Sequence, residues 1–164
     1  LGERPDGYHE LRTVMHSIGL FDTVTVTARP YSGPDRYIRV RASEPLPFLN
    51  TARRAAEAYF DAADRLCPES VCGLAVSIDL QKGIPSEAGL GGASADGAAV
   101  LFALERLIGA LGTEKLYEIA PSVAGFSLTT RMDSRKSLNW GNLVRTVKYN
   151  PPQNSSSARG QPVR

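Results

Sequence analysis

The feature that most constrains this chain is a glycine-rich segment placed between a strand pattern and a helix pattern. Residues 72–80 alternate apolar and polar side chains, as a strand with one buried face does. Residues 94–109 carry the apolar spacing of an amphipathic helix, and the segment that joins the two reads KGIPSEAGLGGAS. Because glycine adopts backbone conformations closed to other residues, this junction predicts a tight turn from a strand into a helix.

The remaining patterns predict two strands and two helices. Residues 18–28 and 36–42 alternate like strands, and a turn rich in proline and glycine separates them. An alanine-rich helix is expected over 51–66, with Asn50 as its N-cap and Cys67-Pro68 as its end, and a short helix over 113–120. The order strand, strand, helix, strand, glycine-rich loop, helix predicts a layered domain of the α+β or α/β class.

Length and composition indicate one globular domain. The 164 residues are 42% hydrophobic and 22% charged, and no apolar run approaches the length of a membrane span. No signal-peptide pattern follows Leu1, although the chain does not start with methionine. Cys67 and Cys72 are too few for a disulfide scaffold and lack the partners of a zinc site, so we expect reduced thiols in a cytoplasmic protein.

The charge of the chain is unevenly distributed. Residues 1–124 contain 12 Lys or Arg against 16 Asp or Glu, a net charge of −4, whereas residues 125–164 contain 7 against 1, a net charge of +6. The second segment is rich in Ser, Asn, Arg and Pro and poor in apolar periodicity, so we expect a disordered basic tail. Contact of this tail with nucleic acid or anionic lipid is the alternative. The tail lacks interleaved aromatic residues for base stacking.

The glycine-rich segment also has the chemistry of an anion site. Glycines let an anion approach the backbone, and the helix that follows offers free N–H groups and the positive end of its dipole. Ser94 adds a hydroxyl for phosphate or magnesium, and Asp96 is expected in the first helical turn. The segment is neither a P-loop, since no Gly-Lys-Ser/Thr follows, nor a dinucleotide fingerprint, since Ser94 replaces the third glycine. A connection whose glycines only turn the chain is the alternative.

Two segments of the chain resemble a known enzyme family. The segment IPSEAGLGGASADGAAVLFAL resembles the second motif of the GHMP small-molecule kinases. The segment RPDGYHELRTVMHSIGLFDTVTV looks specifically like the members that act on 4-diphosphocytidyl-2-C-methyl-D-erythritol in non-mevalonate isoprenoid biosynthesis. The resemblance covers about Leu1 to Pro121.

The resemblance implies a fold, a reaction and a set of site residues. The fold would be a GHMP-kinase N-terminal domain (ribosomal protein S5 domain 2-like) over 1–121, incomplete at its first strand, with a divergent tail over 122–164. The reaction would transfer phosphate from ATP, with Mg²⁺, to the 2-hydroxyl of the substrate. Tyr8 would stack on the cytosine of the small-molecule substrate and His9 would bind the edge of that base. The implied nucleotide-binding residues are Asn50, Lys82, Pro85, Ser86, Glu87, Ala88, Gly89, Leu90, Gly91, Gly92, Ala93, Ser94, Ala95 and Asp96.

The chain also departs from the family pattern. Where the family has its catalytic aspartate the sequence reads PSVAGFSL, with no aspartate before Asp133, and the strand that carries the catalytic lysine is not in the chain. Ala93 and Ala95 replace a glycine and a serine, and Glu87 brings a negative charge near the phosphates. We therefore assign no catalytic residue, and we expect little or no turnover and an unpaired sheet edge.

Other interpretations of the same residues stay open. The chain could be a GHMP kinase of the homoserine or mevalonate type, or a nucleotide-binding module that is not an enzyme. Without the resemblance, Tyr8 and His9 are typical surface residues of a turn, Asn50 is a helix cap and Lys82 is a solvated loop charge. We expect neither a membrane nor a nucleic-acid partner.

Overall fold

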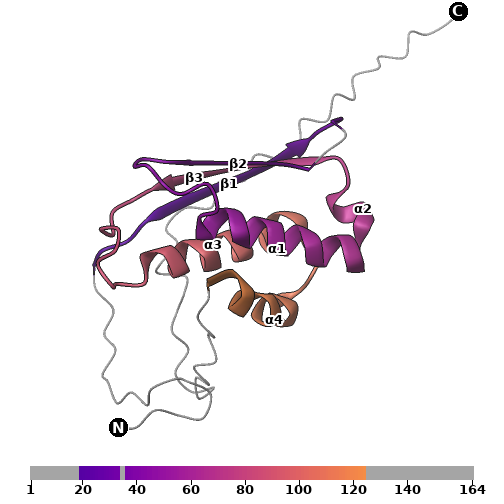
Figure 1. Ribbon diagram of the computed structural model, residues 1–164. Coiled ribbons are helices and arrows are strands. Elements are labelled where there is room, and N and C mark those ends of the chain that lie inside the picture. The colour runs from indigo at the N-terminus through magenta and orange to yellow at the C-terminus, as the bar shows by residue number, and fades with distance from the viewer. Residues whose placement is uncertain (1–18, 34–35, 125–164) are drawn as a thin grey trace, which may run out of the picture.

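The protein is built from a three-stranded sheet that carries its helices on one face (Figure 1). The computed structural model describes residues 19–33 and 36–124. Helices α1 and α3 pack against the sheet, and α4 packs against both of them. The elements in chain order are β1 (Thr23–Pro30), β2 (Tyr37–Ala42), α1 (Thr51–Leu66), α2 (Pro68–Val71), β3 (Leu74–Gln81), α3 (Gly92–Ile108) and α4 (Thr113–Ala124).

The strand order in the sheet is β1-β3-β2. β1 runs antiparallel to β3 with Thr23 opposite Gln81 and Pro30 opposite Leu74, and β2 runs parallel to β3. All three strand predictions are confirmed, with shifted ends. β1 begins at Thr23 and not at residue 18, because its pairing reaches only as far as the eight residues of β3. This register places the start of β1 beside the end of β3.

The core lies between the sheet and the helices. The alternating residues Val24, Val26, Val76 and Ile78 are fully or almost fully buried, as the period of two predicts. Small residues bring the helices close together. A Cβ added at Gly97 of α3 would lie 2.7 Å from the Thr51 side chain of α1. No helix in the described ranges is both long and apolar enough to cross a membrane.

Helix α1 has the predicted start and end. Asn50 Oδ1 accepts a hydrogen bond of 3.0 Å from the Arg53 N–H, and the helix ends at Leu66, just before Cys67. The short helix α2 that follows was not predicted, although Pro68 suits its first turn. Cys67 and Cys72 are both free thiols, as expected.

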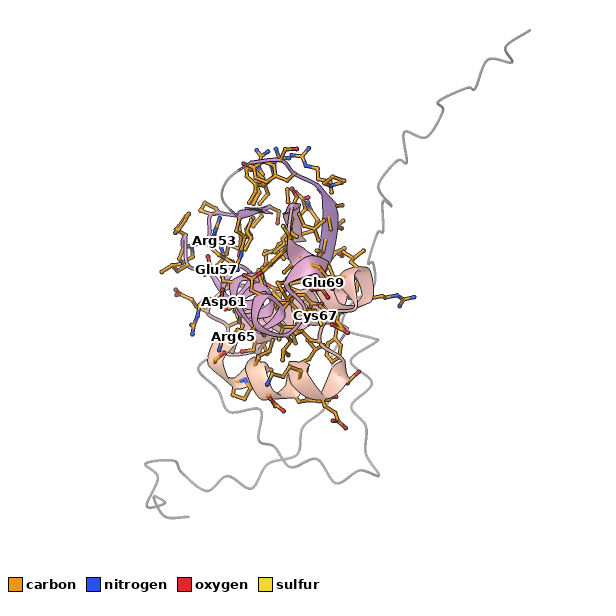
Figure 2. All side chains as sticks on the ribbon, turned by 90° about the vertical axis from the view of Figure 1, so that its right-hand side faces the viewer. Arg53, Glu57, Asp61, Arg65, Cys67 and Glu69 are labelled. Carbon is orange, nitrogen blue, oxygen red and sulfur yellow. The ribbon has the colours of Figure 1, made fainter. Side chains whose placement is uncertain are left out.

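One side of α1 carries charged residues of both signs at helical spacing. Figure 2 shows Arg53, Glu57, Asp61 and Arg65 along this side. Arg53 lies 3.4 Å from Glu57, and Arg36 is paired with Asp61 at 2.6 Å. The Arg36–Asp61 pair is exposed and the Arg53–Glu57 pair is partly buried. Surface ion pairs of this kind contribute little to stability.

Helices α3 and α4 differ from the predicted bounds. α3 begins at Gly92 and not at residue 94, because the left-handed backbone of Gly91 ends the loop there. α4 continues through Pro121 to Ala124, beyond the predicted end at residue 120, and buries Val123. The sequence analysis assigns residues 122–124 to the divergent tail, whereas the structure places them in α4. The rest of the tail, and the predicted substrate residues Tyr8 and His9, lie outside the described residues.

Candidate functional site

The glycine-rich loop leaves β3 at Lys82 and enters α3 with a backbone whose φ alternates in sign. Glu87, Gly89 and Gly91 have φ of 61°, 71° and 73°, whereas Ala88 and Leu90 between them have negative φ. A Cβ added at Gly89 or Gly91 would meet nothing within 4 Å, so glycine is required there for its backbone conformation and not for space. Backbone of this kind can turn N–H groups toward one side and form a concavity suited to an anion.

The start of α3 completes this concavity. Gly91 precedes the helix and provides no side-chain cap, so no cap side chain occupies the N–H groups of the first turn. The first turn consists of Gly92, Ala93, Ser94 and Ala95. The structure thus places the predicted phosphate residues 85–95 in one continuous loop and helix start, and residues 85–91 are exposed.

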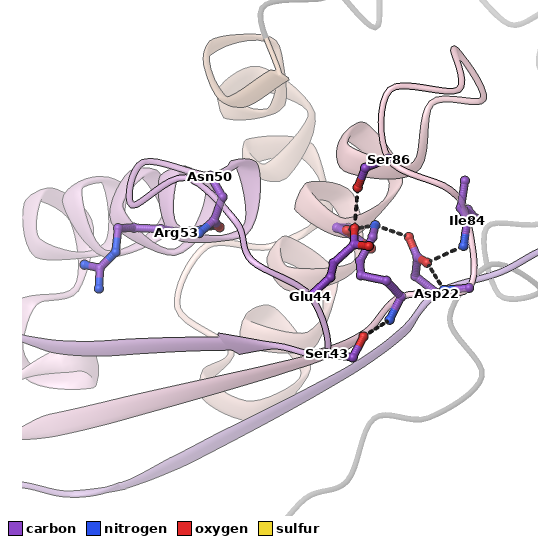
Figure 3. Close-up of polar contacts among 10 residues, drawn as sticks. Asp22, Ser43, Glu44, Asn50, Arg53, Ile84 and Ser86 are labelled. Carbon is purple, nitrogen blue, oxygen red and sulfur yellow. Dashed lines mark hydrogen bonds and ion pairs between the residues drawn. The ribbon is translucent and has the colours of Figure 1, made fainter.

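Three charged side chains are buried beneath the loop. Lys82 donates a hydrogen bond of 2.8 Å to Asp96 Oδ2 and another to Asp22 Oδ2. The side chain of Lys82 is 7% exposed, that of Asp96 is 6% exposed and that of Asp22 is 3% exposed. Asp22 Oδ1 accepts from the N–H groups of Gly83 and Ile84 at 2.7 and 2.8 Å (Figure 3). We call Asp22, Lys82 and Asp96 the buried charge cluster.

The buried charge cluster corrects one alternative interpretation and one prediction. Lys82 is not a solvated loop charge, because its ammonium is enclosed by two carboxylates. Asp96 is not in the first turn of α3, because the helix begins at Gly92 and places Asp96 in its second turn, facing inward. The buried carboxylate therefore lies under the anion-binding concavity and does not belong to its lining.

Two carboxylates that share one ammonium have different pKa values. Burial alone would raise the pKa of Asp22, but hydrogen bonds from Ile84 N–H, Lys82 and Gly83 N–H outweigh it and lower the pKa below 3.8. Burial alone would lower the pKa of Lys82, because it disfavours the charged ammonium. The hydrogen bonds to both carboxylates outweigh this effect and raise the pKa. For Asp96, burial and the nearby Asp22 charge outweigh Lys82 and raise the pKa to about 6. Its Oδ1 has no hydrogen-bond partner within the described chain.

A cavity of about 430 Å³ lies beside the loop. It is formed by β2, residues 44–50 and the start of α1, and Asn50 lines it. The exposed ring of Phe48 forms part of its wall, with the Arg53 guanidinium 4.4 Å from the ring centroid. Lys82, which the resemblance implied as a nucleotide-binding residue along with Asn50, does not line this cavity.

Residues 43 and 44 connect the cavity with the loop. Glu44 lines the cavity and accepts a hydrogen bond from the Ser86 hydroxyl (Figure 3). Ser43 Oγ accepts the backbone N–H of Lys82 at 2.9 Å. The cavity and the concavity are therefore adjacent, and together they can hold a ligand with a planar apolar group at one end and a phosphate at the other.

Sequence reasoning missed three residues of this site: Asp22, Glu44 and Phe48. Asp22 immediately precedes β1, and the antiparallel register with Thr23 opposite Gln81 brings it beside Lys82. Only the pairing of β1 with β3 reveals this neighbour, and no local pattern specifies that pairing. Among the described residues, no three His, Cys, Asp or Glu side chains gather as a metal site.

Comparisons with known proteins agree on one family. The model of the GHMP kinases N terminal domain matches residues 50–133. A 4-diphosphocytidyl-2-C-methyl-D-erythritol kinase of Carboxydothermus hydrogenoformans is 41% identical over 125 residues, which are 76% of this chain and 40% of that protein. A protein of the same name from Corynebacterium glutamicum is 38% identical over 124 residues, which are 71% of this chain and 38% of that protein.

A solved structure is similar to the chain as well. It is a crystal structure of 4-(cytidine 5'-diphospho)-2C-methyl-D-erythritol kinase, 35% identical, with a TM-score of 0.45 over 60% of this chain and 31% of that one. The chain spans between 32% and 40% of the length of the curated relatives that it matches.

Proposed function

The chain belongs to the GHMP kinase family, and from this premise we propose that the loop between β3 and α3 binds the phosphates of Mg-ATP. The observation that carries the proposal is the alternation of φ over Glu87, Gly89 and Gly91, directly before the uncapped start of α3. Backbone N–H groups arranged in this way stabilise a phosphate without a side-chain cation.

We propose that the adjacent cavity receives the nucleoside of ATP. Phe48 offers an aromatic face for a base, and Asn50 offers an amide that can both donate and accept hydrogen bonds. Asn50 Oδ1 already caps α1, and its NH₂ group donates to Pro47 O at 3.0 Å. A role for Asn50 in binding therefore includes holding the wall of the cavity in place.

The proposed reaction is phosphorylation of the 2-hydroxyl of 4-diphosphocytidyl-2-C-methyl-D-erythritol. Support comes from the names of the relatives and from the identity of about 40% that they share with this chain. Tyr8 and His9 are the proposed contacts to the cytosine. A small-molecule substrate of this kind fits a cytoplasmic enzyme without a membrane or nucleic-acid partner.

We further propose that the 164 residues alone bind ATP but transfer its phosphate slowly or not at all. The segment Pro121 to Leu128 has no carboxylate at the place where the family has its catalytic aspartate. A general base contributes about 10²–10⁴ in rate, so its loss reduces turnover strongly even where binding is retained.

Calorimetric titration with Mg-ATP tests the binding proposal through two matched variants. Gly91→Ala and Gly112→Ala both introduce a side chain at a positive φ, 73° and 77°, and neither Cβ meets an atom within 4 Å. Both changes carry similar strain of about 1–2 kcal/mol, but only Gly91 belongs to the loop. We expect ATP affinity to fall about tenfold in Gly91→Ala and to change less than about twofold in Gly112→Ala. Equal effects, or no binding by the unaltered chain, would contradict the proposal.

Release of ADP tests the reaction. Purified chain is given Mg-ATP with 4-diphosphocytidyl-2-C-methyl-D-erythritol, and in parallel with homoserine or mevalonate. Binding of ATP and of the cytidine substrate without turnover is the expected result. Turnover with homoserine or mevalonate would identify a different member of the family. Rapid turnover with the cytidine substrate would show that another residue supplies the base.

A further inference from the structure

We propose that Asp22 is a positioning residue of the phosphate loop, which it holds through the backbone N–H groups of Gly83 and Ile84 and through Lys82. This inference rests on the proposed function, since it assumes that the loop binds phosphate. Asp22 lies outside the loop in sequence and contacts no phosphate itself. It acts by fixing the first residues of the loop relative to the sheet and to α3.

The first observation is the set of bonds that Asp22 accepts. Its Oδ1 accepts from Gly83 and Ile84 at 2.7 and 2.8 Å, and its Oδ2 accepts from the Lys82 ammonium. Asp22 is only 3% exposed, so water cannot replace these partners without opening the structure. Hydrogen bonds to a buried charged group are among the stronger ones in proteins. One carboxylate therefore holds three consecutive residues, 82 to 84, at the point where the loop leaves β3.

The second observation is the close approach of backbones around Asp22. A Cβ added at Gly83 would lie 2.4 Å from the carbonyl oxygen of Phe21. At the other end of the loop, a Cβ added at Gly92 would lie 3.4 Å from Asp22 Oδ2 and 3.1 Å from Ile84 Cγ2. The two ends of the loop thus meet over the same carboxylate.

The third observation is the connection to α3. Lys82 donates to Asp22 and also to Asp96, which lies in the second turn of α3. Through Lys82 the position of β1 is linked to the helix whose N-terminus forms half of the concavity. A shift of Asp22 therefore moves the loop and the helix start relative to each other, which would spoil the arrangement of N–H groups that a phosphate needs.

The test compares ATP with adenosine in binding to the full chain. Asp22→Asn keeps the size of the side chain but removes its charge and sets an amide against Lys82. We expect its affinity for Mg-ATP to fall at least about tenfold, while its affinity for adenosine changes less than about twofold. Asp79→Asn, which removes a carboxylate from β3 away from the loop, is the matched control and should leave both affinities unchanged.

A second variant perturbs the same contact between Asp22 and the loop without changing the charge of the site. Gly83→Ala places its Cβ against the Phe21 carbonyl and pushes the loop away from Asp22. It should reproduce the selective loss of ATP affinity, and it keeps the inference testable if Asp22→Asn fails to fold.

The outcomes separate this inference from the proposed function. If the unaltered chain does not bind ATP, the proposed function fails, and the inference fails with it. If the unaltered chain binds ATP but both variants bind it normally, the inference alone is wrong. Equal loss of ATP and adenosine affinity in the variants would mean that Asp22 supports the fold in general, and this result also overturns the inference.

Discussion

Replacement of Asp96 by asparagine should change how the stability of the protein depends on pH. In the native protein, burial and the neighbouring Asp22 raise the pKa of Asp96 from 3.8 to about 6. An acid with a raised pKa in the folded state binds its proton more tightly there than in the unfolded chain. Its contribution to stability is complete below pH 3.8 and is lost as the pH rises through 6. The native protein should therefore become more stable, through this group, as the pH falls from 7 to 5.

The size of the effect follows from the pKa values. A difference of about two units between the folded and unfolded states corresponds to a penalty of about 3 kcal/mol when Asp96 is fully ionised. About 1 kcal/mol of this penalty is relieved between pH 7 and pH 5. Asp96→Asn cannot ionise, and it leaves Lys82 paired with Asp22. The free energy of unfolding of the native protein should thus rise by about 1 kcal/mol relative to that of the variant over this range.

Urea denaturation at pH 7, 6 and 5 measures this difference, since the other titrating groups are common to both proteins and cancel. Asp79→Asn serves as the control and should follow the native protein at each pH. If the curves of the native protein and Asp96→Asn run parallel within about 0.3 kcal/mol, Asp96 does not carry a shifted pKa. The account of two buried carboxylates competing for one ammonium would then be wrong.

Three further changes test the packing and the loop. Gly97→Ala forces a Cβ to within 2.7 Å of the Thr51 side chain and should lower the free energy of unfolding by about 1–3 kcal/mol, measured by urea denaturation. Asn50→Ala removes the cap of α1 and should cost about 1 kcal/mol in thermal unfolding, whereas Asn50→Asp retains a capping oxygen and should cost less. Glu87→Gly relieves a left-handed backbone, φ 61°, and removes a negative charge from the loop. Calorimetry should therefore show tighter binding of Mg-ATP, and unchanged or weaker binding would contradict the position given to the phosphates.

The local elements of this fold can be predicted from the sequence because short-range physics determines them. The alternation of Val24 and Val26 with threonines specifies a strand with one buried face, and Asn50 specifies the first residue of α1. The glycine-rich segment indicates the turn into α3, and the proposed anion binding rests on the same residues. The ends of the elements depend on tertiary contacts, since the pairing partner limits β1 and the burial of Val123 extends α4 past Pro121.

The buried charge cluster was decided by tertiary structure alone. Sequence reasoning assigned Lys82 to nucleotide binding, with a solvated loop charge as the alternative. It placed Asp96 in the first helical turn, and it gave Asp22 no role. These three residues are 60 and 14 positions apart in the chain, so no local pattern connects them. Their charges meet because the antiparallel register of β1 and β3 sets Asp22 beside Lys82, and because α3 begins two residues earlier than its apolar spacing indicates. Local spacing specifies which face of an element is buried, whereas only the packing of distant elements determines which charges share that burial.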